Sequence, residues 1–237
     1  VLKELEKKTK SKKTLLRNTV ESINELKEEK NELKKEIVII EEIRNASNIA
    51  FMQKSLNELE DRLSGTRVYR ETSGKDHWQG WVYKNNWMFG ISYAAPIEKQ
   101  KIGFDNIPDF IFPTIDGFID ILEIKLPTHD VIKKDDSHAG SFMWTNKTSE
   151  AIGQAVNYLH EIELNQLQIQ KKIKENRQLD LLIIKPRVLI LIGNSSTWNN
   201  SYKEGLRKLN YSLHGIEVIT YTDLQNRAKQ VVKLYEK

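Results

Sequence analysis

The stretch IPDFIFPTIDGFIDILEIKL, residues 107–126, decides the fold of this chain. Residues 110–112 are aromatic and β-branched, and residues 118–126 resume that pattern, as is typical of strands. Residues 115–117, Ile-Asp-Gly, supply a turn between them. We therefore predict a β-hairpin, and the prolines that bracket its first strand indicate that this strand is short or lies near a sheet edge.

The hairpin carries charged side chains where its strands begin and end. Asp109 directly precedes the first strand, and the second contains Glu123 and Lys125. Side chains alternate along a strand, so Glu123 and Lys125 share a face and lie roughly 6.5 Å apart. A charged pair that ends an apolar row is costly to bury unless another group compensates it. A divalent cation would do so, although a solvated charge pair is the simpler reading of Glu-x-Lys alone.

The residue types suit Mg²⁺, or Mn²⁺, which prefer oxygen ligands and retain several waters. We expect Asp109 and Glu123 to supply carboxylate ligands and Ile124 to supply its main-chain carbonyl. Such an ion polarises a phosphate oxygen and makes a bound water more acidic. Lys125 would then act as a catalytic cation that holds the water or stabilises charge on phosphorus.

A predicted helix follows this hairpin in the sequence. Residues 148–159 begin with Thr-Ser, a helix start signal, and place Gln154 and Tyr158 on one face at positions i and i+4. Gln154 is a candidate to bind a metal-bound water or a phosphate, and Tyr158 a candidate to contact a nucleic-acid strand. A polar helix face is the alternative.

These residues resemble a known family. Asp109, Glu123 and Lys125, followed by Gln154 and Tyr158, resemble the PD-(D/E)XK nuclease superfamily in the branch with a Q-x-x-x-Y helix. The flanking sequence is similar to Shedu anti-phage defence proteins over roughly residues 70–237. The segments that carry this similarity are residues 77–81, 86–90, 188–193 and 216–224.

The resemblance implies a restriction-endonuclease-like α/β fold, with a mixed sheet flanked by helices and preceded by a long helical, coiled-coil segment. It also implies a metal-dependent DNA endonuclease or nickase of bacterial phage or plasmid defence. Such nucleases carry a further acidic ligand on a leading helix, for which we choose Asp76 over Glu71. The alternatives are a catalytically silent nucleic-acid-binding module and a structural adaptor.

Composition limits the other classes of protein. The 237 residues include no cysteine, which excludes disulfides and thiolate metal sites and fits a bacterial cytoplasm. No apolar run approaches the length of a membrane span. The net charge of +4 is compatible with DNA as partner, and Lys133 and Lys134 are candidate contacts. Because the first residue is Val, we expect a longer protein whose N-terminal part is missing.

Residues 1–63 differ from the rest of the chain. They contain no Gly, Pro or Trp, and basic and acidic residues nearly balance. Apolar residues follow a heptad pattern that breaks at residues 44–48 and then restarts, which is typical of a coiled coil. The seam comprises Leu16, Ile23, Leu26, Leu33, Ile37 and Ile40, then Ile49, Met52, Leu56, Leu59 and Leu63. We predict a homo-oligomer, dimer or tetramer, formed through residues 1–63, with the nuclease domain at 64–237. The alternative is a helix that folds back onto its own domain.

The remaining segments are read more simply. Residues 127–148 are predicted to be a long polar loop over the substrate, and their histidines and aspartates lack the tight spacing of a zinc site. The tryptophans between residues 65 and 103 are assigned to the core rather than to base stacking. The last third alternates strand 180–192, helix 200–209, strand 216–221 and helix 223–236, as in α/β proteins.

Overall fold

The computed structural model describes residues 2–98 and 108–236 and divides into two compact units, Val1–Phe51 and Met52–Lys237. Helix α1 (Leu2–Leu63) contributes to both. Ile107, the first residue of the stretch quoted above, lies outside the described residues. Within the described ranges, every helix falls short of the apolar length needed to cross a bilayer.

The heptad seam of α1 has two different environments. In the first unit the seam residues from Leu16 to Ile40 are exposed to solvent, for example Leu26 at 63% and Leu33 at 53%, and Ile49 is half-buried. In the second unit Leu56 and Leu59 are buried in the domain core. The last turns of α1 therefore pack onto the domain, as in the alternative considered for this helix. The predicted boundary between the helical segment and the following domain is residue 63, whereas the second compact unit begins at Met52. The difference arises because Leu56 and Leu59 pack in the core of the second unit.

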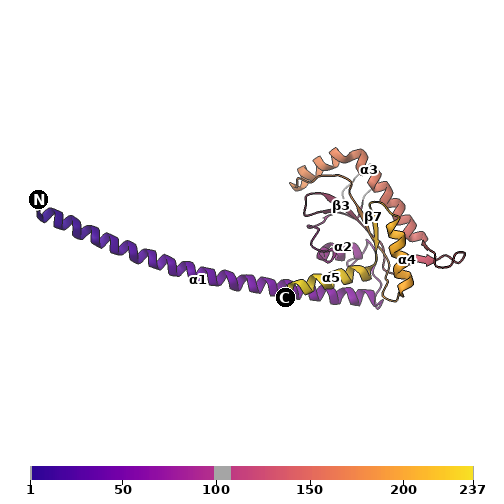
Figure 1. Cartoon of the computed structure of the whole chain (residues 1–237), viewed down its shortest axis with the longest axis horizontal. Coiled ribbons are helices and arrows are strands. Elements are labelled where there is room, and N and C mark those ends of the chain that lie inside the picture. Colours follow the sequence, from indigo (N-terminus) through magenta and orange to yellow (C-terminus); the bar gives the residue numbers. More distant parts are fainter. Residues whose placement is uncertain (1, 99–107, 237) are drawn as a thin grey trace. The chain divides into compact units, whose positions relative to one another are not determined.

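The second unit is built on a mixed sheet, as predicted (Figure 1). Its strand order is β1-β2-β3-β6-β7, antiparallel from β1 to β3 and parallel from β3 to β7. The predicted hairpin is β2–β3, in which Phe110 pairs with Leu122. The strands are β1 (Ile97–Glu98), β2 (Phe110–Pro113), β3 (Ile119–Ile124), β6 (Val188–Leu191) and β7 (Ile216–Ile219).

Alternation along β3 assigns its side chains to two cores. Ile119 and Ile121 pack with helix α3 (Asn146–Arg177) on one face. Leu122 and Ile124 pack on the other face, against four helical elements. These are the end of α1, α2 (Trp78–Lys84), the 3-10 helix η1 (Asn86–Phe89) and α5 (Tyr221–Tyr235). The sheet therefore lies between helical layers (Figure 1).

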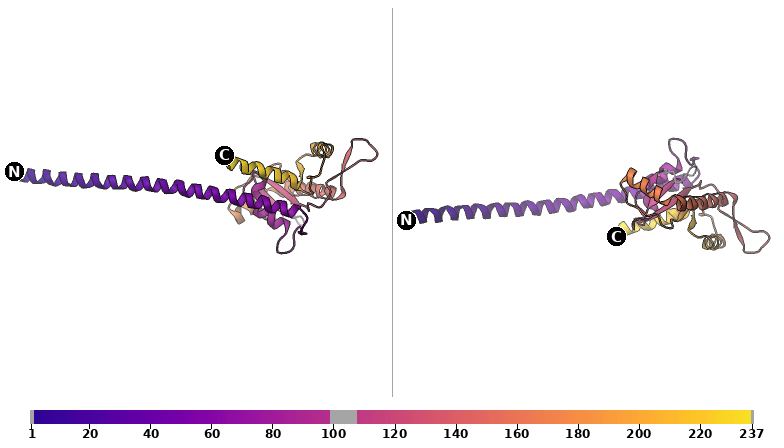
Figure 2. Two further views of the ribbon diagram at one scale, coloured as in Figure 1. Left: turned by 90° about the horizontal axis from the view of Figure 1, so that it is seen from below. Right: turned by 90° about the horizontal axis from the view of Figure 1, so that it is seen from above.

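Two predicted segments differ from the structure. The segment 127–148 contains a hairpin of β4 (Ile132–Lys134) and β5 (Phe142–Trp144), whose tip projects from the unit (Figure 2). It forms because its apolar ends pack on the core and on helix α4 (Asn200–Tyr211), where Phe142 contacts Tyr202. The strand predicted over 180–192 is shorter, since β6 begins only after Pro186.

Candidate active site

Glu123 and Lys125 meet at the end of β3. Lys125 Nζ lies 2.8 Å from Glu123 Oε1, with the glutamate side chain 5% and the lysine side chain 17% exposed. The second carboxylate oxygen, Glu123 Oε2, is buried without a hydrogen-bond partner in the described part of the chain. The predicted shared face is therefore present, and it is largely withdrawn from solvent.

Asp109 approaches the same strand end from the start of β2. Its Oδ2 accepts a hydrogen bond of 2.8 Å from the Ile124 amide, and its Oδ1 accepts one from Gln79 Nε2 on α2. This carboxylate also interacts electrostatically with Glu123 and Lys125. The structure thus brings three of the four predicted catalytic residues together, and it gives the Ile124 amide a role in holding Asp109.

Burial and charge act together on these groups. The pKa of Asp109 is raised to about 7, first by burial and then by the charge of the Glu123 carboxylate, against the opposing effects of the Ile124 amide and Lys125. Burial lowers the pKa of Lys125, but its ion pair and hydrogen bond with Glu123 outweigh burial, so the pKa is raised overall. The lysine is therefore protonated at neutral pH, while the two carboxylates repel each other.

The two candidates for the third acidic residue, Asp76 and Glu71, lie in different surroundings. Asp76 forms ion pairs with Arg62 and, at 3.6 Å, with Arg67. Glu71 is half-buried, and burial raises its pKa, which also responds to the charges of Lys125 and Glu123. Glu71 therefore belongs to the carboxylate cluster, whereas the carboxylate of Asp76 is neutralised by arginines.

The two candidate residues of helix α3, Tyr158 and Gln154, have different surroundings. Tyr158 is buried on α3 and its hydroxyl hydrogen-bonds to Glu123; burial, then the charges of Glu123 and Asp109, raise its pKa. The Tyr158 side chain therefore packs inward against a carboxylate of the site, and its contact with a nucleic-acid strand stays a prediction. Gln154 lies one turn earlier and is exposed.

The candidate DNA-contacting lysines lie on the projecting hairpin. Lys133 and Lys134 are exposed on β4, and Lys134 Nζ is 5.9 Å from the centre of the Tyr202 ring. The structure therefore places them with α4 rather than beside Asp109 and Glu123.

Other residues of the site were not predicted. Gln79 holds Asp109, and the Tyr221 hydroxyl donates a 2.9 Å hydrogen bond to the Lys125 carbonyl. His129 is half-buried; burial, then the charges of Lys147 and Lys125, lower its pKa. Gln79 stood in the aromatic segment 77–81 that the sequence had marked, but nothing local indicated which side chain it would meet.

The residues present fit a hydrated divalent cation. Within the described ranges, no group of three or more His, Cys, Asp or Glu side chains is arranged to hold a metal ion. Asp109 and Glu123 remain as two mutually repelling carboxylates, with Glu123 Oε2 unpartnered. Mg²⁺ commonly binds through one or two carboxylates and completes its shell with water. The donor set therefore suits Mg²⁺ or Mn²⁺ better than zinc.

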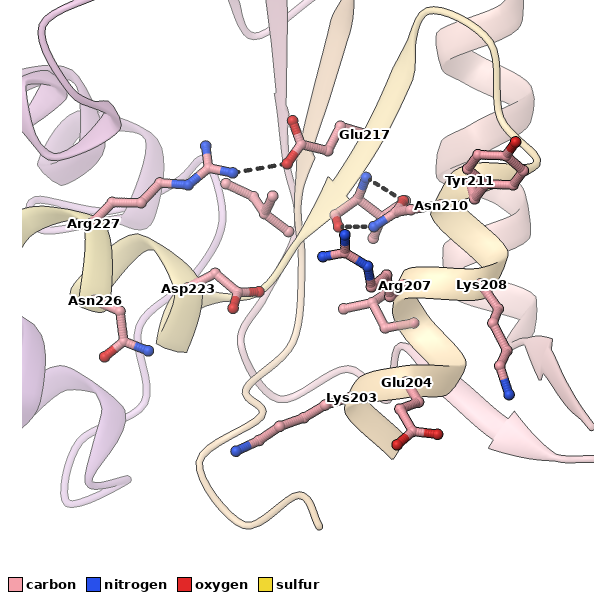
Figure 3. A pocket seen from close by; sticks show the side chains of 13 residues that line it. Lys203, Glu204, Arg207, Lys208, Asn210, Tyr211, Glu217, Asp223, Asn226 and Arg227 are labelled. Atoms are coloured by element: carbon pink, nitrogen blue, oxygen red, sulfur yellow. Dashed lines mark hydrogen bonds and ion pairs between the residues drawn. The ribbon is translucent and has the colours of Figure 1, made fainter. Parts of the chain in front are cut away.

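A wide hollow elsewhere in the unit is not part of this site. It measures about 1040 Å³ and lies between α4, β7 and α5 (Figure 3). Arg227 pairs with Glu217 at 2.7 Å, and the Asn210 side chain bonds both main-chain groups of Val218. These polar groups in the lining of the hollow thus already have hydrogen-bond or ion-pair partners within the protein.

Comparison with known proteins gives a family. A family model described as Shedu protein SduA, C-terminal, matches residues 72–225. This range includes all five strands of the β1-β2-β3-β6-β7 sheet and every carboxylate discussed above except that of Glu71. No curated protein matches the chain.

Proposed function

The chain belongs to the Shedu family, and from this premise we propose that it is a metal-dependent DNA endonuclease or nickase of bacterial phage and plasmid defence. Family membership supports a role in defence. The observation that supports hydrolytic chemistry is the buried, unpartnered Glu123 Oε2 beside Asp109 and Lys125.

The residues have distinct proposed roles. Asp109 and Glu123 would hold Mg²⁺ or Mn²⁺ together with the Ile124 carbonyl, and Glu71 would add negative charge nearby. When bound, the ion supplies Lewis acidity and a more acidic water. Lys125 is protonated, so it donates hydrogen bonds and stabilises charge on the phosphate rather than acting as a base. Gln154, being exposed, is free to orient water or phosphate.

The exposed seam of α1 supports the oligomeric part of the proposal. Leu16, Ile23, Leu26, Leu33, Ile37 and Ile40 are all exposed. Apolar side chains at heptad spacing are buried when two or more helices supercoil. We propose that a second copy of this chain covers this face in a dimer or tetramer.

A second function is favoured by one observation. Glu123 is already engaged by Lys125 and Tyr158, and within the described ranges no ready-made group of three metal ligands is present. A nucleic-acid-binding module without catalysis would keep such a closed ion pair.

Plasmid cleavage separates the two. Supercoiled plasmid is incubated with the protein and Mg²⁺, alongside Lys125→Ala and the control Lys172→Ala, an exposed lysine on α3. We expect relaxed or linear product from the wild type and the control, and a loss of roughly 100-fold in Lys125→Ala. Equal cleavage by Lys125→Ala would show a contaminating nuclease. Binding without cleavage in all three would favour the silent module.

A further inference from the structure

A buried arginine lies behind the carboxylate site. Arg62, in the last turn of α1, has a side chain only 2% exposed, and its Nη1 has no partner in the described part of the chain. Its guanidinium forms ion pairs with Glu58, at 3.1 Å, and with Asp76. Burying an arginine is costly unless the site compensates it, so its retention here requires an explanation.

The guanidinium is surrounded by aromatic rings. It lies 4.1 Å from the ring centre of Tyr69, 5.5 Å from that of Trp78 and 5.3 Å from that of Trp81. Distances below about 6 Å are those of cation–π contacts. We call Arg62 with these rings the Arg62 cluster. It joins α1, the segment before α2, and α2 itself.

Two contacts lead from Trp78 to the active site. Gln79, its neighbour in sequence, donates to Asp109 Oδ1. On the other side, the Trp78 ring lies 4.6 Å from that of Tyr221, whose hydroxyl bonds the Lys125 carbonyl. Trp78 is 1% exposed, so it cannot move without displacing these neighbours.

The main chain joins Glu71 to the same place. The Trp78 amide donates to the Arg70 carbonyl at 3.0 Å, and the Gln79 amide donates to the Glu71 carbonyl at 3.1 Å. Glu71 and Gln79 are therefore fixed to each other directly beside the Arg62 cluster.

We propose that Arg62 is a positioning residue for the active site, which acts through Trp78 to hold Gln79 against Asp109 and Tyr221 against Lys125. The activity part of this inference rests on the proposed nuclease function, and the structural part does not. Because Arg62 belongs to α1, the same contacts connect that helix to the catalytic carboxylates.

The chain offers a matched control. Arg67 also pairs with Asp76 and lies 5.0 Å from the Tyr69 ring centre, but its side chain is 65% exposed. Arg67→Met therefore removes a similar charge beside the same partners without disturbing Trp78.

The first measurement is independent of cleavage. In ¹⁵N-labelled protein, the side-chain amide signals of Gln79 are identified by their loss in Gln79→Met. We expect Arg62→Met to shift these signals and Arg67→Met to leave them in place, at a temperature where melting curves show both to be folded. Unshifted Gln79 signals in folded Arg62→Met would reduce Arg62 to a stabilising role and overturn the proposal.

The second measurement uses activity. Under saturating DNA and Mg²⁺, we expect the single-turnover cleavage rate of Arg62→Met to fall at least about tenfold with little change in DNA affinity. Arg67→Met should cleave like the wild type. If Arg62→Met does not fold, Arg62→Lys, which keeps the charge and loses the planar guanidinium, replaces it and should shift the Gln79 signals. If the wild type does not cleave, the nuclease function fails, and the Gln79 signals still decide the role of Arg62.

Discussion

At the scale of single residues, two carboxylates carry the proposed chemistry: Asp109, directly before β2, and Glu123 in β3. Asp109 and Glu123 come from different strands, yet the hairpin register and the Ile124 amide bring them to one strand end. Burial removes water from both, and the Glu123 carboxylate makes Asp109 harder to ionise. The divalent cation that we propose would relieve this repulsion beside the Lys125–Glu123 ion pair.

Asp109 should make the stability of the metal-free protein depend on pH. Its pKa is about 7 when folded and near its ordinary value of about 4 when unfolded, so the folded state binds more protons between these values. Stability from this group is therefore lost as pH rises through that window. We expect Asp109→Asn to melt higher than the wild type at pH 8 and to lose this advantage near pH 4. Melting curves across this range check it, with Asp116→Asn, an exposed aspartate, as control.

Mg²⁺ should reverse the order of the two melting temperatures at pH 8, so that the wild type melts higher than Asp109→Asn. At tenfold excess over its dissociation constant, a ligand stabilises the folded state by about 1.4 kcal/mol, or about 3–6 °C for a chain of this size. We expect this shift in the wild type and its loss in Asp109→Asn. An equal shift in both proteins would place the ion elsewhere.

The sequence was informative where local geometry sufficed. Alternation correctly predicted that Glu123 and Leu122 lie on opposite faces of β3. Glycine and proline correctly delimited the β2–β3 hairpin. Gln79 and Tyr221 were missed because they reach the site only through tertiary packing of α2 and α5. The sequence could not show how the surroundings of Asp76 and Glu71 differ. Asp76 forms an ion pair with Arg62, which lies on the other side of a loop.

At the scale of elements, α1 shows how one periodic pattern serves two purposes. The part of the seam in the first unit is exposed, whereas Leu56 and Leu59 fill the core of the second unit. Heptad spacing alone cannot distinguish these outcomes, since both bury apolar side chains at the same interval.

The exposed seam should control self-association. Replacing Leu26 and Leu33 by glutamate puts repelling charges at the proposed helix contact, so we expect oligomers to dissociate into monomers. Asn24→Glu with Asn31→Glu, on the outer face of the helix at heptad position b, is the matched control and should keep the wild-type mass. Sedimentation velocity measures both. A wild type that is monomeric at high concentration would contradict the proposed role of the seam.

Two helical glycines test the packing of α4 on the β4–β5 hairpin. A Cβ at Gly205 would lie 2.6 Å from the Phe142 ring, whereas one at Gly153 in α3 would meet nothing within 4 Å. Alanine favours helix by about 1 kcal/mol over glycine, but overpacking costs about 1–3 kcal/mol. We expect Gly153→Ala to raise the melting temperature and Gly205→Ala to lower it. Equal changes would mean that Phe142 moves aside freely.

At the scale of the whole molecule, the folded unit begins before the end of the long helix. A chain of residues 52–237 keeps Leu56, Leu59 and Arg62, whereas one of residues 64–237 exposes the surface they cover. Losing a buried leucine side chain typically costs about 2–5 kcal/mol. We expect the first chain to melt cooperatively and the second to lose cooperative melting, as followed by circular dichroism. Similar melting of both would show that α1 is dispensable to the core.

The far edge of the sheet restricts how copies of this protein can associate. The Asn210 amide occupies the outward N–H and C=O of Val218, so a strand from another molecule cannot add to β7 at that point. Growth of a continuous intermolecular sheet, the route to fibrous deposits, is thereby obstructed on this side. Copies of the protein that collide in a crowded cell thus meet a blocked position on this strand rather than an open template for polymerisation.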